Sequence, residues 1–404
     1  MATTKITNPE LFDLASLDTA LKLPSGTTAE RPTSPSTGEW RYNTTTNLVE
    51  FWDGGEWRDL QSEDIPPIPS ENFNVVIWTG DGTASRAITG VGFKPDWVWY
   101  KERSNVGDHT VHDIVRGAGE RLFPNDPSAE SLDANSLQAF ESDGFQIGTN
   151  ADVNGNGETY VGWNWLADNT SGSSNTDGSI TSTVSANTTS GFSIVSYTGN
   201  GTAGATVGHG LGVAPKMVIV KSRSGAYDWL VYHDSIGNGK AVKLNTTDAE
   251  LTSSVYWNST SPTSSVFSLG TSTAGNSSSA TQIAYCFAEK KGFSKFGSYV
   301  GNGETPNGTF VYTGFKPAFV MGKATSGTEN WFMNDNKRLG YNDKNYRLYP
   351  NLSNNEATDS NMEILSNGFK LNTANGNSNG VGKTYIYMAF AEEPLVGDNP
   401  ATAR

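Results

Sequence analysis

The chain has little of what several common classes of protein require. It contains one cysteine, Cys286, so no disulfide can form within the chain. Charged residues make up only 17% of its 404 residues, and the net charge is −14. No basic run is longer than Lys290-Lys291. Because phosphate binding needs clustered Lys and Arg, this composition disfavours a nucleic-acid partner.

Two kinds of apolar segment are also missing from the sequence. No stretch approaches the ~20 apolar residues that a membrane-spanning helix needs, so we expect no membrane span. The first residues, MATTKITNPELFDL, have neither a basic region nor a long apolar region. We therefore expect no secretory signal, synthesis in the cytoplasm and release by lysis of the cell.

Glycine and aromatic residues are abundant instead. There are 44 glycines, and 11% of the residues are Phe, Trp or Tyr. Short aromatic segments alternate with turns of Gly, Asn, Ser and Thr, which is typical of short strands. Because no stretch shows sustained helical periodicity, we predict an all-β protein.

One pattern of landmarks occurs three times along the chain. Each copy starts with an aromatic residue before a Gly-Asn/Asp-Gly turn, at Trp78, Tyr197 and Tyr299. A proline, a lysine, an aspartate, a Phe-containing strand and an aromatic strand then follow in the same order. In the three copies these landmarks are Pro95, Lys101, Asp113, 145–147 and 160–165; Pro215, Lys221, Asp234, 267–269 and 282–287; and Pro317, Lys323, Asp335, 369–371 and 385–390. Chance similarity would not keep both order and spacing, so we infer three copies of one domain.

The repeat length of about 100 residues fits a small domain rather than a solenoid unit. We predict three tandem β-sandwich domains of jelly-roll type. Their boundaries are 71–168, 191–290 and 291–404. Residues 169–190 are almost devoid of apolar side chains and are predicted to form a flexible linker.

Residues 1–70 form a different, smaller module. Asn8 and Pro9 predict the start of a short helix. Residues 39–43, 48–52 and 56–60 predict three strands joined by polar turns. Such a unit cannot bury its apolar side chains alone, so we expect it to pack against other chains. The predicted anchor residues are Leu11, Phe12, Leu14, Trp40, Tyr42, Trp52 and Trp57.

Two segments resemble known proteins. Residues 31–60 carry Arg-Pro, Ser-Pro and Arg-Tyr-Asn-Thr, and resemble a short motif of bacteriophage tail-fibre and other virion proteins. Residues 72–168 are similar to a repeat domain of structural proteins of marine phages of the cyanophage and pelagiphage types. The resemblance implies an exposed virion protein, assembled as a homotrimer.

The search for catalytic chemistry yields no site. The aspartates at 113, 234 and 335 occur once per repeat, so they form no local carboxylate pair of the kind a glycosidase uses. His112 and His233 precede two of them, but no nucleophile motif accompanies them. We interpret the aspartates as hydrogen-bonding residues at turns or strand ends, and the repeated lysines as residues at the sheet rim. We predict no catalytic residue, and hence no enzyme.

Cofactor and metal sites are likewise not predicted. Residues 152–158 resemble half of a calcium loop, but Trp163 stands where the closing Glu would be, so we interpret them as a turn. Most aromatic residues are predicted to lie in the core. Trp229 and Trp331 stand near loops and are the best candidates for contacting a carbohydrate or another receptor on a cell.

The resulting prediction is a phage virion protein, most simply a tail fibre on the virion surface. Its N-terminal module would bind other virion proteins, and its C-terminal β domains would contact a host glycan or protein. Two alternatives remain open. One is an architectural virion protein, such as a capsid decoration, head fibre or tail component, without a receptor role. The other is a glycan-cleaving tailspike.

Overall fold

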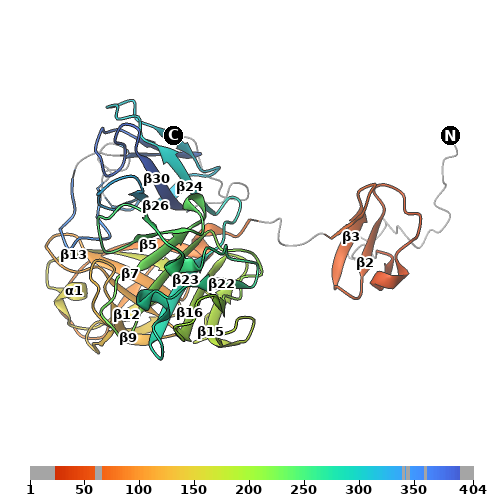
Figure 1. The fold of residues 1–404 in the computed structure, drawn as a ribbon, viewed down its shortest axis with the longest axis horizontal. Coiled ribbons are helices and arrows are strands. Elements are labelled where there is room, and N and C mark those ends of the chain that lie inside the picture. Colours follow the sequence, from red (N-terminus) through yellow and green to blue (C-terminus); the bar gives the residue numbers. More distant parts are fainter. Residues whose placement is uncertain (1–22, 60–65, 339–341, 343–345, 359–361, 392–404) are drawn as a thin grey trace, which may run out of the picture. The chain divides into compact units, whose positions relative to one another are not determined.

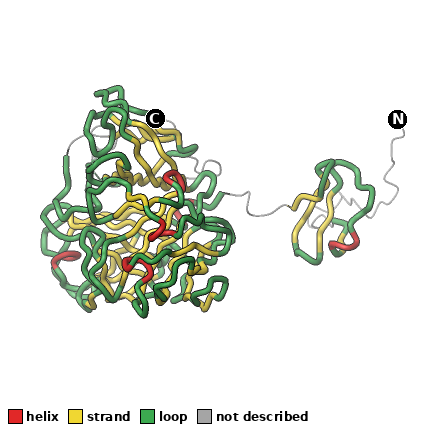
Figure 2. The backbone as a smooth tube through the Cα atoms, in the orientation of Figure 1, coloured by secondary structure: helices red, strands yellow, loops and turns green. Residues whose placement is uncertain are grey.

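The computed structural model describes residues 23–59, 66–338, 342, 346–358 and 362–391. The chain divides into two compact units, Met1–Ile65 and Pro66–Arg404, called here the N-terminal module and the C-terminal unit. Strands make up nearly all of the regular structure (Figures 1 and 2), which confirms the prediction of an all-β protein. Within the described ranges, no helix has the length and apolar character needed to cross a membrane.

The N-terminal module is a four-stranded sheet with the order β1-β2-β3-β4. Its strands are β1 (Ser25–Gly26), β2 (Trp40–Asn43), β3 (Leu48–Trp52) and β4 (Trp57–Asp59). The three predicted strands are therefore present, and β1 adds to them by pairing in parallel with β2. The predicted helix, with Leu11, Phe12 and Leu14, lies outside the described residues.

Each repeat of the C-terminal unit is a sandwich of a large sheet and a small sheet. In the first repeat the large sheet has the order β10-β9-β8-β7-β13-β5 and the small sheet β11-β12-β6. The elements are β5 (Phe73–Thr79), β6 (Arg86–Thr89), β7 (Trp97–Glu102), β8 (Thr110–Asp113), β9 (Gly117–Leu122), β10 (Ser131–Leu132), β11 (Leu137–Glu141), β12 (Gly144–Ile147), α1 (Ala151–Asn154) and β13 (Thr159–Trp165).

The second repeat has the most extensive sheet, with the order β14-β15-β16-β23-β18-β19-β20-β21, and a small sheet β17-β22. The elements are β14 (Ser173–Asn175), β15 (Ser182–Asn187), β16 (Phe192–Thr198), β17 (Ala205–Gly208), β18 (Met217–Ser222), β19 (Leu230–His233), β20 (Lys240–Lys243), β21 (Leu251–Thr252), α2 (Ser254–Trp257), β22 (Val266–Leu269), α3 (Thr273–Asn276) and β23 (Thr281–Phe287).

The third repeat has a large sheet β24-β30-β26-β27 and a small sheet β25-β29-β28. The elements are β24 (Ser294–Val300), β25 (Phe310–Tyr312), β26 (Pro317–Ala324), β27 (Phe332–Asp335), β28 (Met362–Leu365), β29 (Gly368–Leu371) and β30 (Thr384–Ala391). Short 3₁₀ turns at Thr28–Glu30, Pro69–Glu71 and Asp234–Ile236 complete the described elements.

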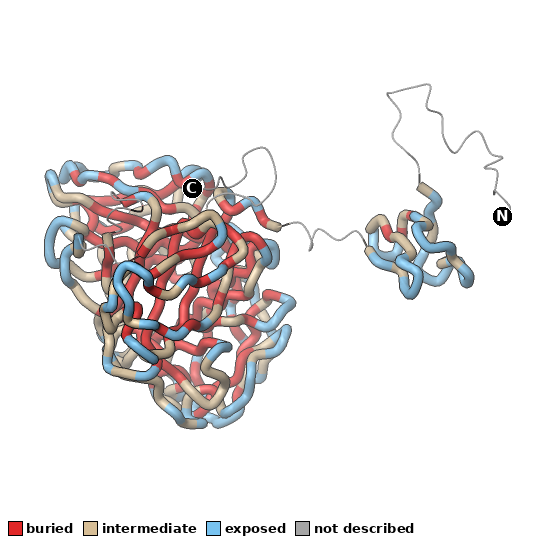
Figure 3. The backbone as a smooth tube through the Cα atoms, turned by 90° about the horizontal axis from the view of Figure 1, so that it is seen from above, coloured by how far each residue is buried: buried red, intermediate tan, exposed pale blue. Residues whose placement is uncertain are grey.

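The three repeats share one central core. Each repeat has a private apolar cluster between its two sheets. A further cluster joins the outer faces of the three large sheets and includes Trp97 and Trp165 of the first repeat, Phe287 of the second, and Phe319 and Phe390 of the third. The Trp97 ring stacks on Tyr285 with centroids 4.5 Å apart. Figure 3 shows the buried chain concentrated inside the C-terminal unit, with exposed loops around it. The repeats are therefore sandwiches, as predicted, packed into a single body.

The prediction of a flexible linker at residues 169–190 is wrong. This segment forms β14 and β15, and all six residues of β15 pair with β16. Two of its few apolar side chains, Ile180 and Val184, are buried in the core of the second repeat. Side chains of a strand point alternately to the two faces of its sheet. When only one of these faces is core, as few apolar residues as those in β15 are enough to form a strand.

A close backbone contact explains the repeated Gly-Asn/Asp-Gly turn. A Cβ atom on Gly80, Gly199 or Gly301 would lie 2.0 to 2.4 Å from a backbone carbonyl oxygen of the turn before the last strand of the same repeat. Only glycine allows this approach. A buried asparagine then fixes the turn in each repeat. Asn276, for example, accepts hydrogen bonds from the N–H groups of Asn200 and Gly201.

Candidate functional site

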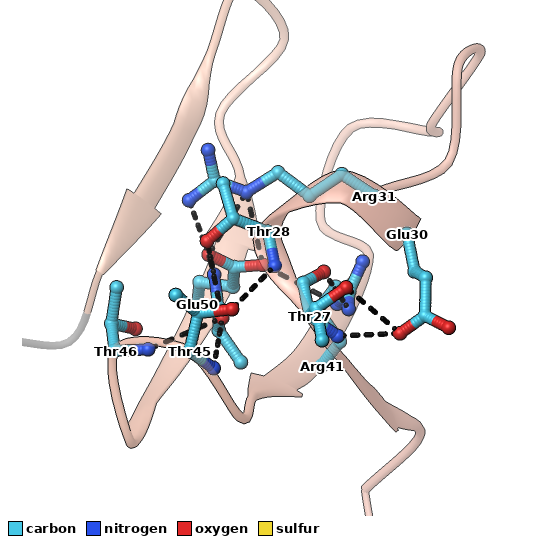
Figure 4. A network of polar contacts seen from close by, with 9 residues as sticks. Thr27, Thr28, Glu30, Arg31, Arg41, Thr45, Thr46 and Glu50 are labelled. Carbon is cyan, nitrogen blue, oxygen red and sulfur yellow. Dashed lines mark hydrogen bonds and ion pairs between the residues drawn. The ribbon is translucent and has the colours of Figure 1, made fainter.

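The N-terminal module is organised around a buried carboxylate (Figure 4). The Glu50 side chain on β3 has no exposed surface. Arg31 donates from Nη2 to Oε2 over 2.6 Å and from Nε to both carboxylate oxygens over 3.2 Å. Arg41 Nε lies 3.3 Å from Oε1, and Asn43 donates to Oε2 over 3.0 Å. Burial by itself would raise the pKa of Glu50, but the bonds from Arg31 and Asn43 outweigh it and lower that pKa.

This network explains the motif at residues 31–60. Arg31 comes from the Arg-Pro pair, and Arg41 and Asn43 come from the Arg-Tyr-Asn sequence. All three converge on Glu50 and so hold β2 and β3 to the segment before them. A sheet this small has too few apolar residues for a core of its own, so a satisfied ionic cluster supplies its order.

The predicted anchor residues of the module lie on opposite faces of its sheet. Side chains along a strand point alternately to its two faces. Trp40 and Tyr42, two residues apart on β2, therefore share the face that is opposite the Glu50 cluster. Trp40 is 44% exposed and stacks on Phe51, with ring centroids 5.4 Å apart. Trp52 and Trp57 pair on the other face, where Arg41 lies over the Trp57 ring. Trp40, Tyr42, Val49 and Phe51 thus share one face of the sheet, called here the aromatic face, on which Trp40 is exposed and the others are half-buried among the described residues.

Backbone hydrogen bonds link the repeats of the C-terminal unit in a closed ring. The N–H of Glu130 in the first repeat donates to the carbonyl of Arg223 in the second over 2.9 Å. Glu250 of the second repeat makes the same 2.9 Å bond to Thr325 of the third. The ring closes between the third and first repeats, where Glu356 donates to Arg103 over 2.9 Å.

Three aromatic side chains make a second set of cyclic contacts. The indole N–H of Trp229 donates to the Phe123 carbonyl of the first repeat over 2.9 Å. The indole of Trp331 makes a 2.8 Å bond to Lys243 of the second repeat. At the equivalent position of the first repeat, His109 Nε2 lies 3.0 Å from the Tyr349 carbonyl of the third.

These contacts overturn the predicted role of Trp229 and Trp331. Both side chains are only 1% exposed, so neither can stack on a sugar. Their rings fill the central core, and their N–H groups join one repeat to the preceding one. The sequence placed them near loops, and the loops prove to be those that pack against the neighbouring repeat.

Two of the three joints of the ring carry a shared carboxylate. Glu130 accepts hydrogen bonds from Arg116 of its own repeat and from Arg223 of the second. At the joint between the third and first repeats, the equivalent residues are Glu356, Arg338 and Arg103. Buried and bidentate Arg–carboxylate contacts of this kind fix orientation as well as distance.

Two of the three repeated aspartates also form contacts between repeats. Asp113 binds Arg116 and accepts the hydroxyl of Tyr285 from the second repeat over 2.8 Å. Asp335 accepts the indole N–H of Trp163 from the first repeat over 3.0 Å. Asp113 and Asp335 therefore form hydrogen bonds at strand ends, as predicted, and these bonds cross between repeats. Asp234 instead pairs with Lys216 of its own repeat.

The second repeat departs from this pattern by one residue. Asp113 stands opposite Trp97, and the residue in the equivalent place opposite Met217 is His233 rather than Asp234. His233 Nε2 lies 3.1 Å from the Tyr387 carbonyl of the third repeat. Burial lowers the pKa of His233 to about 4, so the imidazole is neutral near pH 7. His233 therefore joins the second repeat to the third.

The three repeated lysines are buried, not placed at the sheet rim. Lys101, Lys221 and Lys323 have no exposed surface. Each Nζ donates to the carbonyl of the next residue, and Lys221 and Lys323 also donate to carbonyls of the preceding repeat, at Pro127 and Thr247. Burial lowers the pKa of all three from 10.5 to about 8.

Metal-binding geometry is not found in the described part of the chain. No group of three or more His, Cys, Asp or Glu side chains there could hold a metal ion. Of the predicted turn at 152–158, residues 152–154 belong to α1, which Asn150 caps by accepting the N–H of Asp152. Cys286 is buried at mid-strand, and burial raises the pKa of its thiol.

Sequence analysis missed the glutamates that close the ring. Their signal was present, because Glu130 and Glu250 stand at the same distance from Lys101 and Lys221. Glu356 falls four residues later than this spacing requires, which hid the set. The buried asparagines were also missed, although Asn154, Asn276 and Asn379 each stand six residues before the start of the last aromatic strand.

Comparison with known proteins places most of the C-terminal unit in one family. No curated protein and no solved structure matches the chain. One family model, described as a domain of unknown function (DUF7483), matches residues 68–394. This match extends from the start of the first repeat to the end of the third, so the family's unit is the whole ring of three repeats and not a single sandwich. The chain belongs to the DUF7483 family.

Proposed function

We propose that this chain is a non-enzymatic structural protein of a virus particle, such as a tail fibre. In this proposal the N-terminal module attaches to the particle, and the C-terminal unit is its outward-facing body. The observation that carries the proposal is that histidine and aspartate side chains, which often serve in active sites, here form buried contacts between repeats. His109, His233, Asp113 and Asp335 are buried in contacts between repeats. These buried polar side chains thus hold the three repeats together in one body.

The aromatic face of the N-terminal module is the proposed attachment surface. Trp40 is the most exposed of the described tryptophans and lies flat against Phe51. Arg58 on β4 pairs with Phe51 and so lies on the same face, and aromatic residues and Arg are enriched at protein interfaces. We assign the homotrimer implied by the resemblance to this module as well, because the aromatic residues of the three repeats already fill one core within a single chain.

The attachment role can be tested on particles of the virus that encodes the chain. Immunolabelling with an antibody to the C-terminal unit should decorate purified particles. Trp40→Ser should reduce incorporation of the full chain, whereas Trp52→Ser, on the opposite face, should reduce it less. Light scattering of the purified full chain should show three copies, with Trp40→Ser shifting the mass toward one copy. Particles that lack the chain would refute the virion proposal.

The role of the C-terminal unit needs a test with the intact ring. A fragment starting near residue 190 would cut through the shared core, so binding to host cells should be measured with the full chain. Saturable binding that blocks infection supports a tail fibre that contacts the host. A chain that is present on particles but does not bind cells supports the architectural alternative. Release of soluble sugars from host surface glycans would instead support a tailspike.

A further inference from the structure

Strand β25 of the third repeat presents two aromatic side chains to solvent. Phe310 is 47% exposed and Tyr312 is 64% exposed, whereas Val311 between them is buried. The strand stands at the edge of the sheet β25-β29-β28. Thr309 and Thr313 exchange backbone hydrogen bonds with the segment of β29. Because such bonds alternate along an antiparallel strand, the N–H and C=O groups of Phe310 and Tyr312 point away from β29.

The equivalent edge in the second repeat is covered by the chain itself. Val207 of β17 pairs with Phe267 as Val311 pairs with Phe369, so Thr206 corresponds to Phe310. The N–H of Ile180 donates to the Thr206 carbonyl over 2.9 Å, and the Thr206 N–H donates to the Ser179 hydroxyl over 2.9 Å. Ile180 also forms a parallel bridge with Val207 and is buried.

The covering segment shows what such an edge accepts. A Cβ atom on Gly178 would lie 2.4 Å from the Thr206 carbonyl oxygen, so close approach requires glycine there. The next residue, Ser179, supplies a hydroxyl, and Ile180 supplies a buried aliphatic side chain. Two of the hydrogen bonds to Thr206 use only its backbone. Phe310 has the same two backbone groups in the same orientation, so it can offer both.

Among the described residues of the third repeat, no segment forms a bridge with this edge as Ile180 does in the second. Only residues 288–293 separate β23 from β24, in place of the 22 residues between 169 and 190 that precede β16. We propose that β25 is a docking edge that binds an extended segment of a partner protein, added in parallel, with a Gly-Ser/Thr-aliphatic sequence. The partner's backbone would pair with Phe310, and the two aromatic rings would cover its side chains. This inference stands independently of the proposed virion function.

The first repeat provides a matched comparison. The equivalent strand, β6, also lies at the edge of its sheet, and Ala87 occupies the position of Phe310. Its outward residues Ala87 and Thr89 offer little apolar surface. An edge needs both free backbone groups and side-chain contact to select a partner. We therefore expect the first repeat not to bind.

The chain's own covering segment, supplied as a separate peptide, is a suitable probe. A fluorescent peptide with the sequence of residues 175–185 should raise its anisotropy when titrated with the full-length protein. Phe310→Lys should weaken this binding at least tenfold, and Ala87→Lys should leave it within twofold of the native value. The same peptide methylated on the backbone nitrogen that corresponds to Ile180 should lose binding at least tenfold, because it cannot donate to the Phe310 carbonyl.

Each other outcome overturns the proposal. These are no binding at millimolar protein, binding that Phe310→Lys does not change, or binding that survives backbone methylation. Self-association of the full chain that Phe310→Lys abolishes would show that a second copy, not a partner segment, occupies the edge. Thermal unfolding of each variant should match that of the native chain. If Phe310→Lys fails this control, Tyr312→Lys replaces it with the same expected loss.

Discussion

The three buried lysines predict that the C-terminal unit becomes more stable as the pH rises from 8 toward 10. Lys101, Lys221 and Lys323 have a pKa of about 8 in the folded chain, against 10.5 when exposed. Between these values the unfolded chain binds more protons than the folded chain. Stability therefore rises with pH in this window, and the folded state bears the full cost of burying the charges below pH 8.

The expected effect is large. One pKa unit corresponds to about 1.4 kcal/mol, so each lysine can change the free energy of unfolding by up to about 3 kcal/mol. Three protons give a limiting slope of about 4 kcal/mol per pH unit. Two kinds of group, a buried thiol and buried phenols, oppose it. Burial raises the pKa of the Cys286 thiol, which lowers the slope by one proton above pH ~8.5. Burial also raises the pKa of Tyr385 and Tyr387 to about 12, so stability should fall above pH ~10.

Urea unfolding followed by the fluorescence of the buried tryptophans, at pH steps between 7.5 and 9.5, measures this slope. Cys286→Ala removes the opposing thiol and places at this position the residue that the third repeat has at Ala389. In that background Lys221→Met should reduce the slope by about one third, and adding Lys323→Met should reduce it by about two thirds. A flat profile in the parent, or an unchanged slope in both lysine variants, would refute the proposed burial of charge.

Three further predictions concern single contacts. Trp331→Phe should lower the free energy of unfolding by about 1–3 kcal/mol more than Trp165→Phe. Of these two indoles, Trp331 has a hydrogen-bond partner in the described chain and Trp165 has none. Urea unfolding of both variants measures the difference, because both substitutions remove the same ring volume. Glu50→Gln should destabilise the N-terminal module by about 3–5 kcal/mol by leaving two arginines without their carboxylate. Faster tryptic cleavage after Arg41, with no change in the C-terminal unit, would confirm this, and unchanged cleavage would contradict it. Gly199→Ala should lower the melting temperature by several degrees, since its Cβ would meet a carbonyl oxygen; calorimetry checks this, and an unaltered melting temperature would count against the close contact.

The strands and the threefold repetition could be predicted because they depend on local pattern. Alternating aromatic residues and Gly-rich turns define each strand, and the landmarks recur in order. The sequence could not show which core each face of a strand packs into. Trp97, Val98 and Trp99 lie in β7, a strand that is buried on both faces. Only the structure shows that Val98 faces the core of its own repeat, while both tryptophans face the core shared by all three.

The errors about the lysines and tryptophans have one physical cause, which is that contacts between repeats leave no periodic signal. Lys221 reads as a strand-end lysine, yet its ammonium group is enclosed by carbonyls of two repeats. Trp331 reads as a residue near a loop, yet that loop meets the second repeat. Within the N-terminal module the same limit holds. The motif could be recognised, but the convergence of its two arginines on Glu50 depends on the pairing of β2 with β3.

The closed ring within one chain changes what repetition can do for this protein. In a linear array the end repeats expose an apolar face and need caps, whereas here each large sheet is covered by the other two. Because all three repeats belong to one chain, the joints need not be identical. Two use a glutamate shared by arginines of two repeats. At the third, the Glu250 side chain pairs with Lys240 of its own repeat, and its backbone N–H donates to the Thr325 carbonyl of the next. Order and number of repeats are thereby fixed by the chain. The three repeats differ at their outer edges. Of the equivalent strands β6, β17 and β25, only β25 carries two exposed aromatic residues. We therefore do not expect the ring to provide several binding sites of equal strength. In the proposed homotrimer, avidity would come from copies of the whole chain brought together through the N-terminal module.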